Sequence, residues 1–249
     1  MNIGIIIQAR LGSTRLPKKI LKPFHEDKCI LDIILDKMHQ AEGGKVIVAT
    51  TTDTSNDVLV KYLEQRDELV FRGSENDVLD RFIHAAKQFD VDGIVRICSD
   101  NPFLDIEGIK TLITKAEQTQ ADYIGFKINN MPSIKTHFGF WGEFARLSAL
   151  EKVAATTDDR QAHEHVTIHL YTHPEEYLCE WIDCPDFLQG RDDIRLTIDT
   201  QEDMDNAKQV YSTLAKENAA FGLKEIVAYI DQHEELRESM KNIIKQNTK

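Results

Sequence analysis

The chain opens on a continuous apolar run, Ile3 to Gln8 (IGIIIQ), which leads directly into the polar segment ARLGSTRLPKK at residues 9–19. An apolar run without polar alternation is typical of a strand that is buried on both faces of a sheet. Further runs of this kind alternate with helical patterns: the expected strands are 45–50, 69–71 and 93–97, and the expected helices are 30–38, 54–65, 76–89 and 106–119. This alternation predicts βαβ units, a parallel sheet and right-handed crossovers.

The second half of the chain has a less regular pattern. It predicts strands at 123–128, 177–182 and 194–198, helices at 144–155, 160–171, 201–216 and 223–245, and a loop at 129–142. No internal repeat, low-complexity linker or break in composition divides the sequence. We therefore expect a single domain over residues 1–249, with a docked C-terminal helix at about 222–245.

Charge and composition narrow the class of protein. The 249 residues include 30 Lys and Arg against 42 Asp and Glu, a net charge of −12, which argues against a surface that binds nucleic acid. No apolar run approaches the ~18–20 residues of a membrane span. Arg10 and Arg15 follow the first apolar run, whereas a signal peptide carries its basic residues before it. The four cysteines, Cys29, Cys98, Cys179 and Cys184, are irregularly spaced, so we expect free thiols in a cytoplasmic protein.

The charge is unevenly distributed along the chain. Residues 1–25 contain no Asp or Glu, and their basic residues are Arg10, Arg15, Lys18, Lys19 and Lys22. Such a segment in an acidic protein either holds a small anion or forms a solvated basic loop, and charge alone does not choose between the two.

The position of this segment favours a ligand. In open parallel sheets ligands bind beyond the carboxyl ends of the strands, so the loops that begin at Ala9, Thr51, Arg72 and Cys98 should converge on one site. Gly12 permits the tight turn that aims backbone N–H groups at a phosphate chain, and the Arg and Lys side chains would neutralise its charge. The segment lacks both the Gly-Lys-Ser/Thr ending of a Walker loop and the glycines of a dinucleotide fingerprint.

The residues of this loop resemble the signature of the CMP-sugar-forming cytidylyltransferases. These are the 3-deoxy-manno-octulosonate and acylneuraminate enzymes and their spore-coat polysaccharide relatives. Their pattern Arg-x-Gly-Ser-x-Arg-Leu-Pro-Gly-Lys is met by Arg10, Gly12, Ser13, Arg15, Leu16, Pro17 and Lys19, with Lys18 in place of the second glycine. Four further segments match in the family's order, namely 71–82, 96–102 with Ser99 in place of a glycine, 137–143 with the pair 165–166, and 195–199.

This resemblance implies a fold and an activity. The fold would be a three-layer α/β nucleotidyltransferase (GT-A-like, Rossmann-like) with a mostly parallel mixed sheet. An irregular arm at about 125–190 would reach across a homodimer. The activity would be attack of the hydroxyl of an acidic sugar on the α-phosphate of CTP, with Mg²⁺ as cofactor and pyrophosphate as the second product.

The resemblance also implies roles for particular residues. The catalytic candidates are Arg10, Lys19 and Asp100, and the metal ligands would be Asp100 and Asp199. The nucleotide-binding candidates are Ala9, Arg10, Gly12, Ser13, Arg15, Lys19, Arg72, Ser74, Asp80 and Arg81. The sugar-site candidates are His137, Glu143, His165 and Arg195, with Lys135 and Arg160 as further counter-charges for an acidic sugar.

Several alternatives remain open on the residues alone. An aspartate after a strand is often a helix cap, and Glu143 could be an exposed residue at a helix start. His165 and His169 lie one helical turn apart and could hold zinc. CTP-dependent transfer to a phosphorylated or phosphonate alcohol is the alternative reaction. A non-catalytic nucleotide-binding relative is the alternative outside the enzymes, and Lys18 and Ser99, which replace glycines of the family motifs, would be signs of lost activity.

Overall fold

The apolar run at the start of the chain forms the strand β1 in the middle of one large sheet. The computed structural model describes residues 1–247. In spatial order the strands are β10 (Cys179–Asp183), β7 (Tyr123–Ile128), β9 (Glu143–Arg146), β6 (Gly93–Cys98), β1 (Ile3–Gln8), β4 (Lys45–Thr51) and β5 (Leu69–Gly73). The short strand β8 (Met131–Pro132) pairs with β7. All neighbours are parallel except that β9 runs antiparallel to β6 and β7, and β8 to β7.

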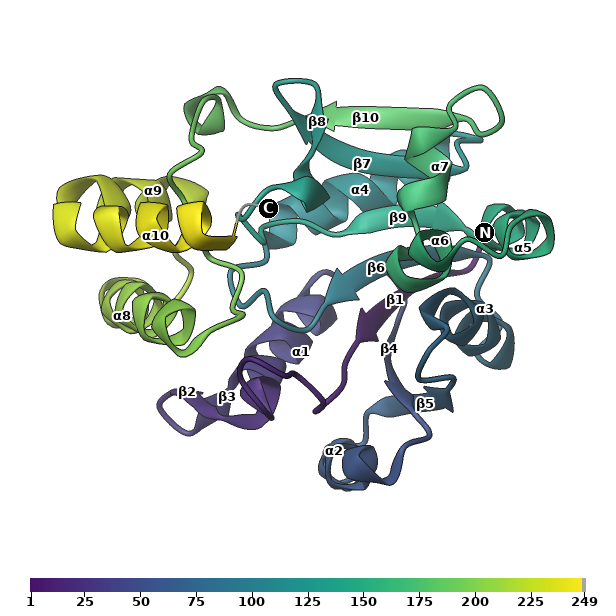
Figure 1. Ribbon diagram of the computed structural model, residues 1–249, viewed down its shortest axis with the longest axis horizontal. Coiled ribbons are helices and arrows are strands. Elements are labelled where there is room, and N and C mark those ends of the chain that lie inside the picture. The colour runs from purple at the N-terminus through teal and green to yellow at the C-terminus, as the bar shows by residue number, and fades with distance from the viewer. Residues whose placement is uncertain (248–249) are drawn as a thin grey trace.

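Helices cover both faces of this sheet and complete three layers (Figure 1). One face carries α1 (Ile30–Gln40), α2 (Asp57–Glu64), α4 (Ile106–Gln118), α8 (Gln201–Glu217), α9 (Leu223–Gln232) and α10 (Glu234–Asn247). The other face carries α3 (Val78–Gln88), α5 (Leu147–Thr156), α6 (Arg160–His165) and α7 (Ile168–Thr172). The side chains of β1 alternate accordingly, because Ile5 and Ile7 join the first core and Ile6 the second.

Smaller elements lie in the connections between these helices and strands. A hairpin of β2 (Pro23–His25) and β3 (Lys28–Cys29) precedes α1, and it was not expected from the sequence. The described residues also form four short 3-10 helices, η1 (Lys19–Leu21), η2 (Thr54–Asn56), η3 (Ser133–Lys135) and η4 (Asp186–Leu188). No helix among residues 1–247 combines the length and apolarity that crossing a membrane requires.

Two expected elements of the second half differ in the structure. The helix expected at 144–155 begins only at Leu147, because residues 143–146 form β9, and Phe144 pairs with Val95 of β6 and Ile124 of β7. Sheet pairing on both sides therefore overrides the helical spacing of these residues. The strand expected at 194–198 is extended chain outside the sheet, and its N–H groups bond to loop carbonyls, Leu196 to His137 and Ile198 to Asp100.

Two expected helices are each divided. The helix expected at 160–171 breaks between α6 and α7, where Val166 has a φ of 59°, a conformation that a β-branched residue rarely adopts. The C-terminal helix expected at 223–245 breaks at His233, between α9 and α10.

The segment 125–190, expected to be an irregular arm, is more regular than the sequence suggested. It supplies β9 and β10 to the central sheet and α5, α6 and α7 to one helical layer. Its irregular part lies mainly between β7 and β9, at residues 129–142.

Candidate active site

The loop after β1 is closed by its own backbone and braced from β4. The Lys18 N–H donates to the Leu11 carbonyl at 3.2 Å, and Lys18 itself has a φ of 56°. This is the left-handed conformation that glycine adopts without steric cost, which explains why the related enzymes carry glycine here. The buried Asn56 accepts the Leu11 N–H at 2.8 Å and donates to the hydroxyl of Thr51 at 2.8 Å. The loop is therefore fixed before any ligand arrives.

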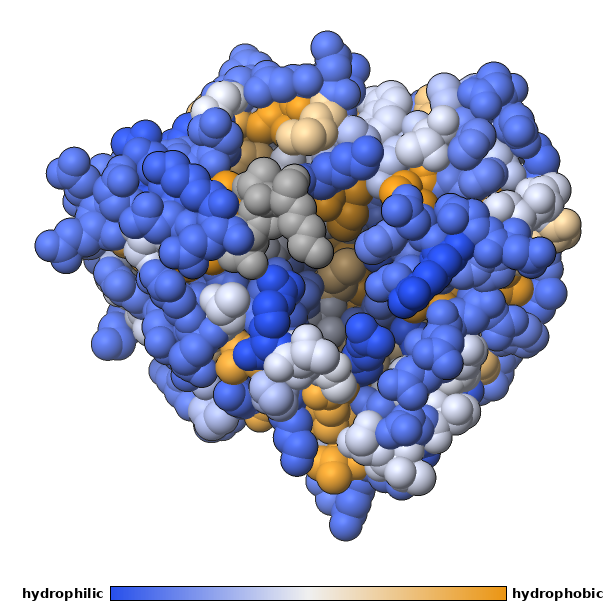
Figure 2. Space-filling model, in the orientation of Figure 1, coloured by the Kyte–Doolittle hydropathy of each residue, from blue (hydrophilic) through white to orange (hydrophobic). Residues whose placement is uncertain are grey.

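This loop forms one wall of a cleft of about 720 Å³ at the carboxyl ends of β1 and β6. The expected site residues that line it are Arg10, Gly12, Ser13, Arg15, Lys19, Asp100, Arg160, His165 and Asp199. Figure 2 shows that this face of the molecule is hollowed near its middle and that strongly hydrophilic side chains stand around the hollow. Residues that are far apart in the sequence thus meet at one edge of the sheet, as the topology predicts.

A basic cluster and two carboxylates meet in the cleft. The Lys19 ammonium lies 2.9 Å from Asp100 Oδ2 and 3.4 Å from Asp199 Oδ1, and it also donates to the carbonyl of Ile198. Arg15 approaches the same Asp199 oxygen at 3.0 Å. Asp100 and Asp199, the two expected metal ligands, therefore both lie within ion-pair distance of the Lys19 ammonium.

Asp199 is held in place by a buried network that continues into α8. Arg195 Nη2 donates to Asp199 Oδ2 at 3.1 Å, and Arg195 also forms two hydrogen bonds to Asp203, at 2.7 and 3.1 Å. Asp203 in turn accepts the N–H groups of Asp199 at 3.0 Å and Thr200 at 2.9 Å. Burial alone would raise the pKa of Asp203, but the hydrogen bonds and charge of Arg195 outweigh it and hold that pKa below its ordinary value.

His137 completes this network on the side away from the cleft. Its Nδ1 accepts a hydrogen bond from Arg195 Nη1 at 2.8 Å. Burial, and then the charge of Arg195, lowers the pKa of His137, which favours the neutral ring that can accept this bond. Neither His137 nor Arg195 lines the cleft, so their geometry suits the positioning of Asp199 better than direct contact with a sugar.

A second buried network lies under the cleft floor. Glu143 is 2% exposed and accepts hydrogen bonds from Arg96 at 2.8 Å, Tyr123 at 2.7 Å and Thr167 at 2.9 Å. It is not the exposed residue that sequence reasoning allowed as an alternative. Arg96 lines the cleft, so Glu143 acts on the site through Arg96.

The segment between β5 and α3 contributes different residues from those expected. Glu75, Asn76 and Val78 line the cleft, whereas Arg72, Ser74, Asp80 and Arg81 do not. Those four residues make local contacts. Arg72 donates hydrogen bonds to the carbonyls of Thr51 and Asp53 in the loop after β4, and Arg81 donates to the Ser74 carbonyl. The Ser74 hydroxyl accepts the Asp77 N–H, and Asp80 forms an ion pair with His84. Burial, and then the charge of Arg10, lowers the pKa of Arg81 to about 10.

Some site residues were missed by sequence reasoning. Gln8 and Glu164 line the cleft, and Asn56 and Asp203 position it. Gln8 is the last residue of β1, so the rule that ligands bind at carboxyl ends would have found it, as it found the loop that begins at Cys98 after β6. Asp203 carries a capping-box signal with Thr200, which marks the start of α8 but does not reveal the link to Arg195.

A cytidylyltransferase family model matches residues 4–238. The chain belongs to the cytidylyltransferase family. It is therefore a nucleotidyltransferase, and the resemblance drawn from its motifs is confirmed.

Individual relatives agree with this assignment. The chain is 32% identical over 240 residues to the spore coat polysaccharide biosynthesis protein SpsF of Bacillus subtilis, and the matched region covers 93% of this chain and 95% of that protein. It is 36% identical over 110 residues to a 3-deoxy-manno-octulosonate cytidylyltransferase of Chlorobium chlorochromatii, 44% of this chain and 43% of that protein. The structure of a cytidylyltransferase from Leptospira borgpetersenii matches with a TM-score of 0.82 and 29% identity, over 95% of this chain and 96% of that chain.

The cytidylyltransferase cleft contains the oxygen ligands that a divalent cation prefers. Asp100, Asp199 and the Ile198 carbonyl surround the Lys19 ammonium, and Mg²⁺ takes oxygen ligands of these kinds together with water and phosphate. The residues present therefore fit such an ion. Within the described chain no group of three or more His, Cys, Asp or Glu side chains is placed to hold a metal ion, so His165 and His169 are not part of such a group.

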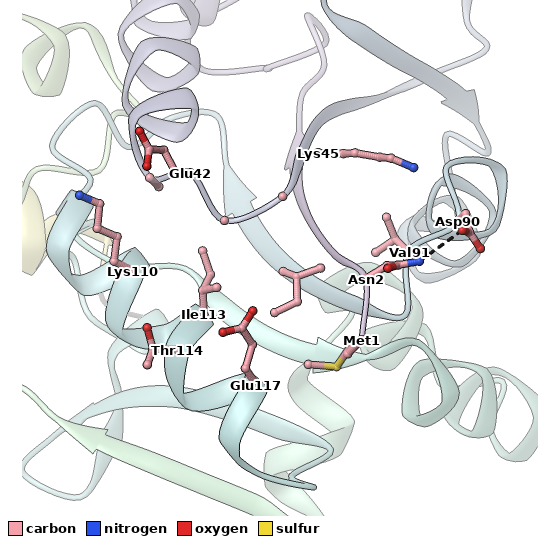
Figure 3. A pocket seen from close by; sticks show the side chains of 14 residues that line it. Met1, Asn2, Glu42, Lys45, Asp90, Val91, Lys110, Ile113, Thr114 and Glu117 are labelled. Carbon is pink, nitrogen blue, oxygen red and sulfur yellow. Dashed lines mark hydrogen bonds between the residues drawn. The ribbon is translucent and has the colours of Figure 1, made fainter.

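A second large hollow lies at the opposite edge of the cytidylyltransferase sheet, at the amino ends of β1 and β4. It measures about 790 Å³ and is bounded by the first residues of the chain, the turn after α1 and one side of α4 (Figure 3). Its charged side chains are dispersed around the rim, and Asn2 is hydrogen-bonded to Asp90 at 3.2 Å. The basic loop and the paired carboxylates lie in the other cleft, which is therefore the candidate active site.

Proposed function

We propose that this enzyme transfers CMP from CTP to the hydroxyl of an acidic sugar, of the ulosonic or nonulosonic class, and releases pyrophosphate. The product would be an activated sugar for a surface polysaccharide or glycoconjugate. The observation that carries the proposal is the convergence of Arg10, Arg15 and Lys19 with Asp100 and Asp199 in one cleft.

The charges of the cleft suit a triphosphate. Arg10, Arg15 and Lys19 come from a loop without acidic residues, and their side chains line the cleft beside the backbone of Gly12 and Ser13. Cations and backbone N–H groups in these positions would bind the β- and γ-phosphates and then the departing pyrophosphate. Nucleotidyl transfer leaves the protein little covalent work, so alignment and charge stabilisation account for most of the catalysis.

Asp100 and Asp199 would hold Mg²⁺ through their carboxylates. When bound, the ion would supply positive charge to the phosphate oxygens during transfer. The Arg195–Asp203 pair would keep Asp199 in place, and its buried position excludes water from these hydrogen bonds.

The acceptor half of the site is supported by fewer contacts. Arg160 and His165 line the cleft on α6, and Arg96 lies in its floor, so a carboxylate of the sugar has cationic neighbours there. Lys135, His137 and Arg195 lie outside the cleft, which leaves Arg160 as the counter-charge that the geometry favours among those expected.

Pyrophosphate release measures this proposal directly. The enzyme would be incubated with CTP, Mg²⁺ and a panel of ulosonic and nonulosonic acids, with phosphorylated and phosphonate alcohols as a second panel. Release with the sugar acids alone supports the proposal, and release only with the alcohols selects the alternative acceptor. Tight CTP binding without turnover on either panel would select the non-catalytic relative. Asp100→Asn serves as the inactive control, and EDTA should stop release until Mg²⁺ is restored.

We also propose that the enzyme works as a homodimer in the cytoplasm. The four cysteines form no disulfide, which suits a reducing compartment. Sedimentation equilibrium of the purified chain would test the dimer.

A further inference from the structure

The Lys19 ammonium lies where a divalent cation would bind. It is 2.9 Å from Asp100 Oδ2 and 3.4 Å from Asp199 Oδ1, and it donates to the Ile198 carbonyl. Its side chain is only 11% exposed, so it is enclosed among these oxygens. Two carboxylates and a carbonyl form the kind of oxygen set that Mg²⁺ or Mn²⁺ takes.

We propose that Lys19 occupies the cation position of the nucleotide-free enzyme and thereby makes divalent-cation binding depend on the nucleotide. The inference rests on the proposed function, since it uses the same carboxylates and the same ligand. Lys19 would leave the carboxylates when a triphosphate offers its own oxygens to the ammonium, and the metal ion would then bind between the two aspartates.

Charge explains why the two cations exclude each other. A metal ion bound to Asp100 and Asp199 would share its carboxylate oxygens with the ammonium, and two like charges held by the same oxygens repel each other. Arg15 at 3.0 Å and Arg195 at 3.1 Å already compensate Asp199. The pair of aspartates therefore has little negative charge left for a metal ion while Lys19 remains in place.

The triphosphate reverses this balance. It brings negative charge to the loop that carries Lys19 and also offers oxygen ligands to the metal. Because binding linkage is reciprocal, the nucleotide should strengthen metal binding by the same factor as the metal strengthens nucleotide binding. The enzyme would thus take up the nucleotide and the metal ion together, which keeps the carboxylates paired in the resting state.

Mn²⁺ titration monitored by electron paramagnetic resonance tests the inference without any turnover. Wild-type protein and the Lys19→Met variant would be titrated with Mn²⁺ in the absence of nucleotide. Methionine keeps an unbranched side chain of similar length and removes the charge. We expect Lys19→Met to bind Mn²⁺ about tenfold more tightly than the wild type, because the competing cation is gone.

Lys18→Met is the matched control. Lys18 is the adjacent residue, is exposed, and carries the same charge outside the pair of carboxylates. Its removal should change Mn²⁺ affinity less than about twofold, as expected for a solvent-screened charge. Asp100→Asn in the Lys19→Met background should abolish the gain, which shows that the ion is measured at this site.

Addition of CTP without an acceptor supplies the second arm. The wild type should gain Mn²⁺ affinity by about tenfold or more after correction for Mn²⁺–CTP in solution, and Lys19→Met should gain less. The inference is overturned if folded Lys19→Met, checked by circular dichroism, binds Mn²⁺ no more tightly than the wild type. Tighter Mn²⁺ binding by Lys19→Met, together with no CMP transfer by the wild-type enzyme to any acceptor, would instead refute the proposed function and leave the competition between Lys19 and the metal standing.

Discussion

The buried pair of Arg195 and Asp203 gives a prediction whose size can be worked from the structure. The Asp203 side chain is 1% exposed and that of Arg195 is 2% exposed. Asp203 Oδ2 accepts three N–H groups and Oδ1 accepts one, Arg195 Nε at 2.7 Å. In Asp203→Asn the single amide oxygen can replace only one of these two carboxylate oxygens. The amide NH₂ takes the place of the other oxygen and cannot accept the N–H group that points at it.

Asp203→Asn therefore loses at least the hydrogen bond from Arg195 Nε, and it also loses the negative charge that compensates the Arg195 guanidinium. A hydrogen bond to a charged group contributes about 1.5–3 kcal/mol, and breaking a buried ion pair costs about 3–5 kcal/mol. Arg195 keeps Asp199 at 3.1 Å, so we expect the lower end of the second range. Asp203→Asn should thus lower the free energy of unfolding by about 3 kcal/mol at pH 7, roughly 150-fold in the unfolding equilibrium.

Urea unfolding followed by circular dichroism measures this difference. The matched control is Asp205→Asn on the same helix, whose carboxylate is exposed and accepts a hydrogen bond from Gln201, and it should change stability by less than about 0.5 kcal/mol. The pKa of Asp203 is lower in the folded state than its ordinary ~3.9, so the stability that it contributes is present above about pH 4 and is lost as pH falls through the folded pKa. A loss below about 1 kcal/mol at pH 7, or a loss that does not shrink in acid, would refute the account of the network.

Three further outcomes are expected. Asp100→Asn should retain a cooperative unfolding transition but lower kcat by at least about 100-fold in the pyrophosphate assay. The pKa of His163 is raised, chiefly by its bond to the Thr157 carbonyl; burial opposes this, and Asp77 at 2.7 Å adds to the rise. His163 therefore stabilises the fold below pH ~6.5 and loses this contribution as pH rises through its folded pKa. His163→Gln should therefore lower the melting temperature at pH 6 and leave it nearly unchanged at pH 9. Lys18→Gly should raise the free energy of unfolding by up to about 1 kcal/mol, measured with urea, because it removes a left-handed φ from a non-glycine residue.

Sequence reasoning worked best where the physical signal is local. The apolar runs that became β1, β4 and β6 are buried on both faces, and within β6 the run is interrupted by Arg96. The carboxyl-end rule then predicted that the loop of Lys19 meets the loop of Asp100, 81 positions away, whereas Asp199, 180 positions away, was expected only from the family resemblance. Neither step needed any contact to be known in advance.

The errors lie where partners from elsewhere decide the conformation. Phe144 and Ala145 have the spacing of the helix that follows them, but they pair with β6 and β7 and so belong to a strand. Residues 194–198 alternate like a strand, but the carbonyls that accept their N–H groups belong to loops at Asp100 and His137. Periodicity describes which faces are apolar, and it does not say which backbone groups are available as partners.

The motif residues raise a similar difficulty for function. Arg195 matched a family motif, and an arginine near a site for anions is readily interpreted as a ligand contact. In the structure its guanidinium is engaged with Asp199, Asp203 and His137, and it lies outside the cleft. A single sequence gives the residue type and its approximate place, but whether an arginine faces the ligand depends on which carboxylates surround it.

The same dependence on distant carboxylates links the two halves of the chain at the cleft. The loop after β1 has no acid of its own, so the partners of Arg15 and Lys19 must come from elsewhere, and they come from Asp100 after β6 and Asp199 before α8. A fragment that ends before Asp199 would leave the two cations with Asp100 as the only one of these carboxylates. The loop after β1 is thus preorganised by the second half of the chain, and cations that are already held in place would need little reorganisation on binding the triphosphate that we propose. This arrangement would let a protein of net charge −12 keep a site for a polyanion.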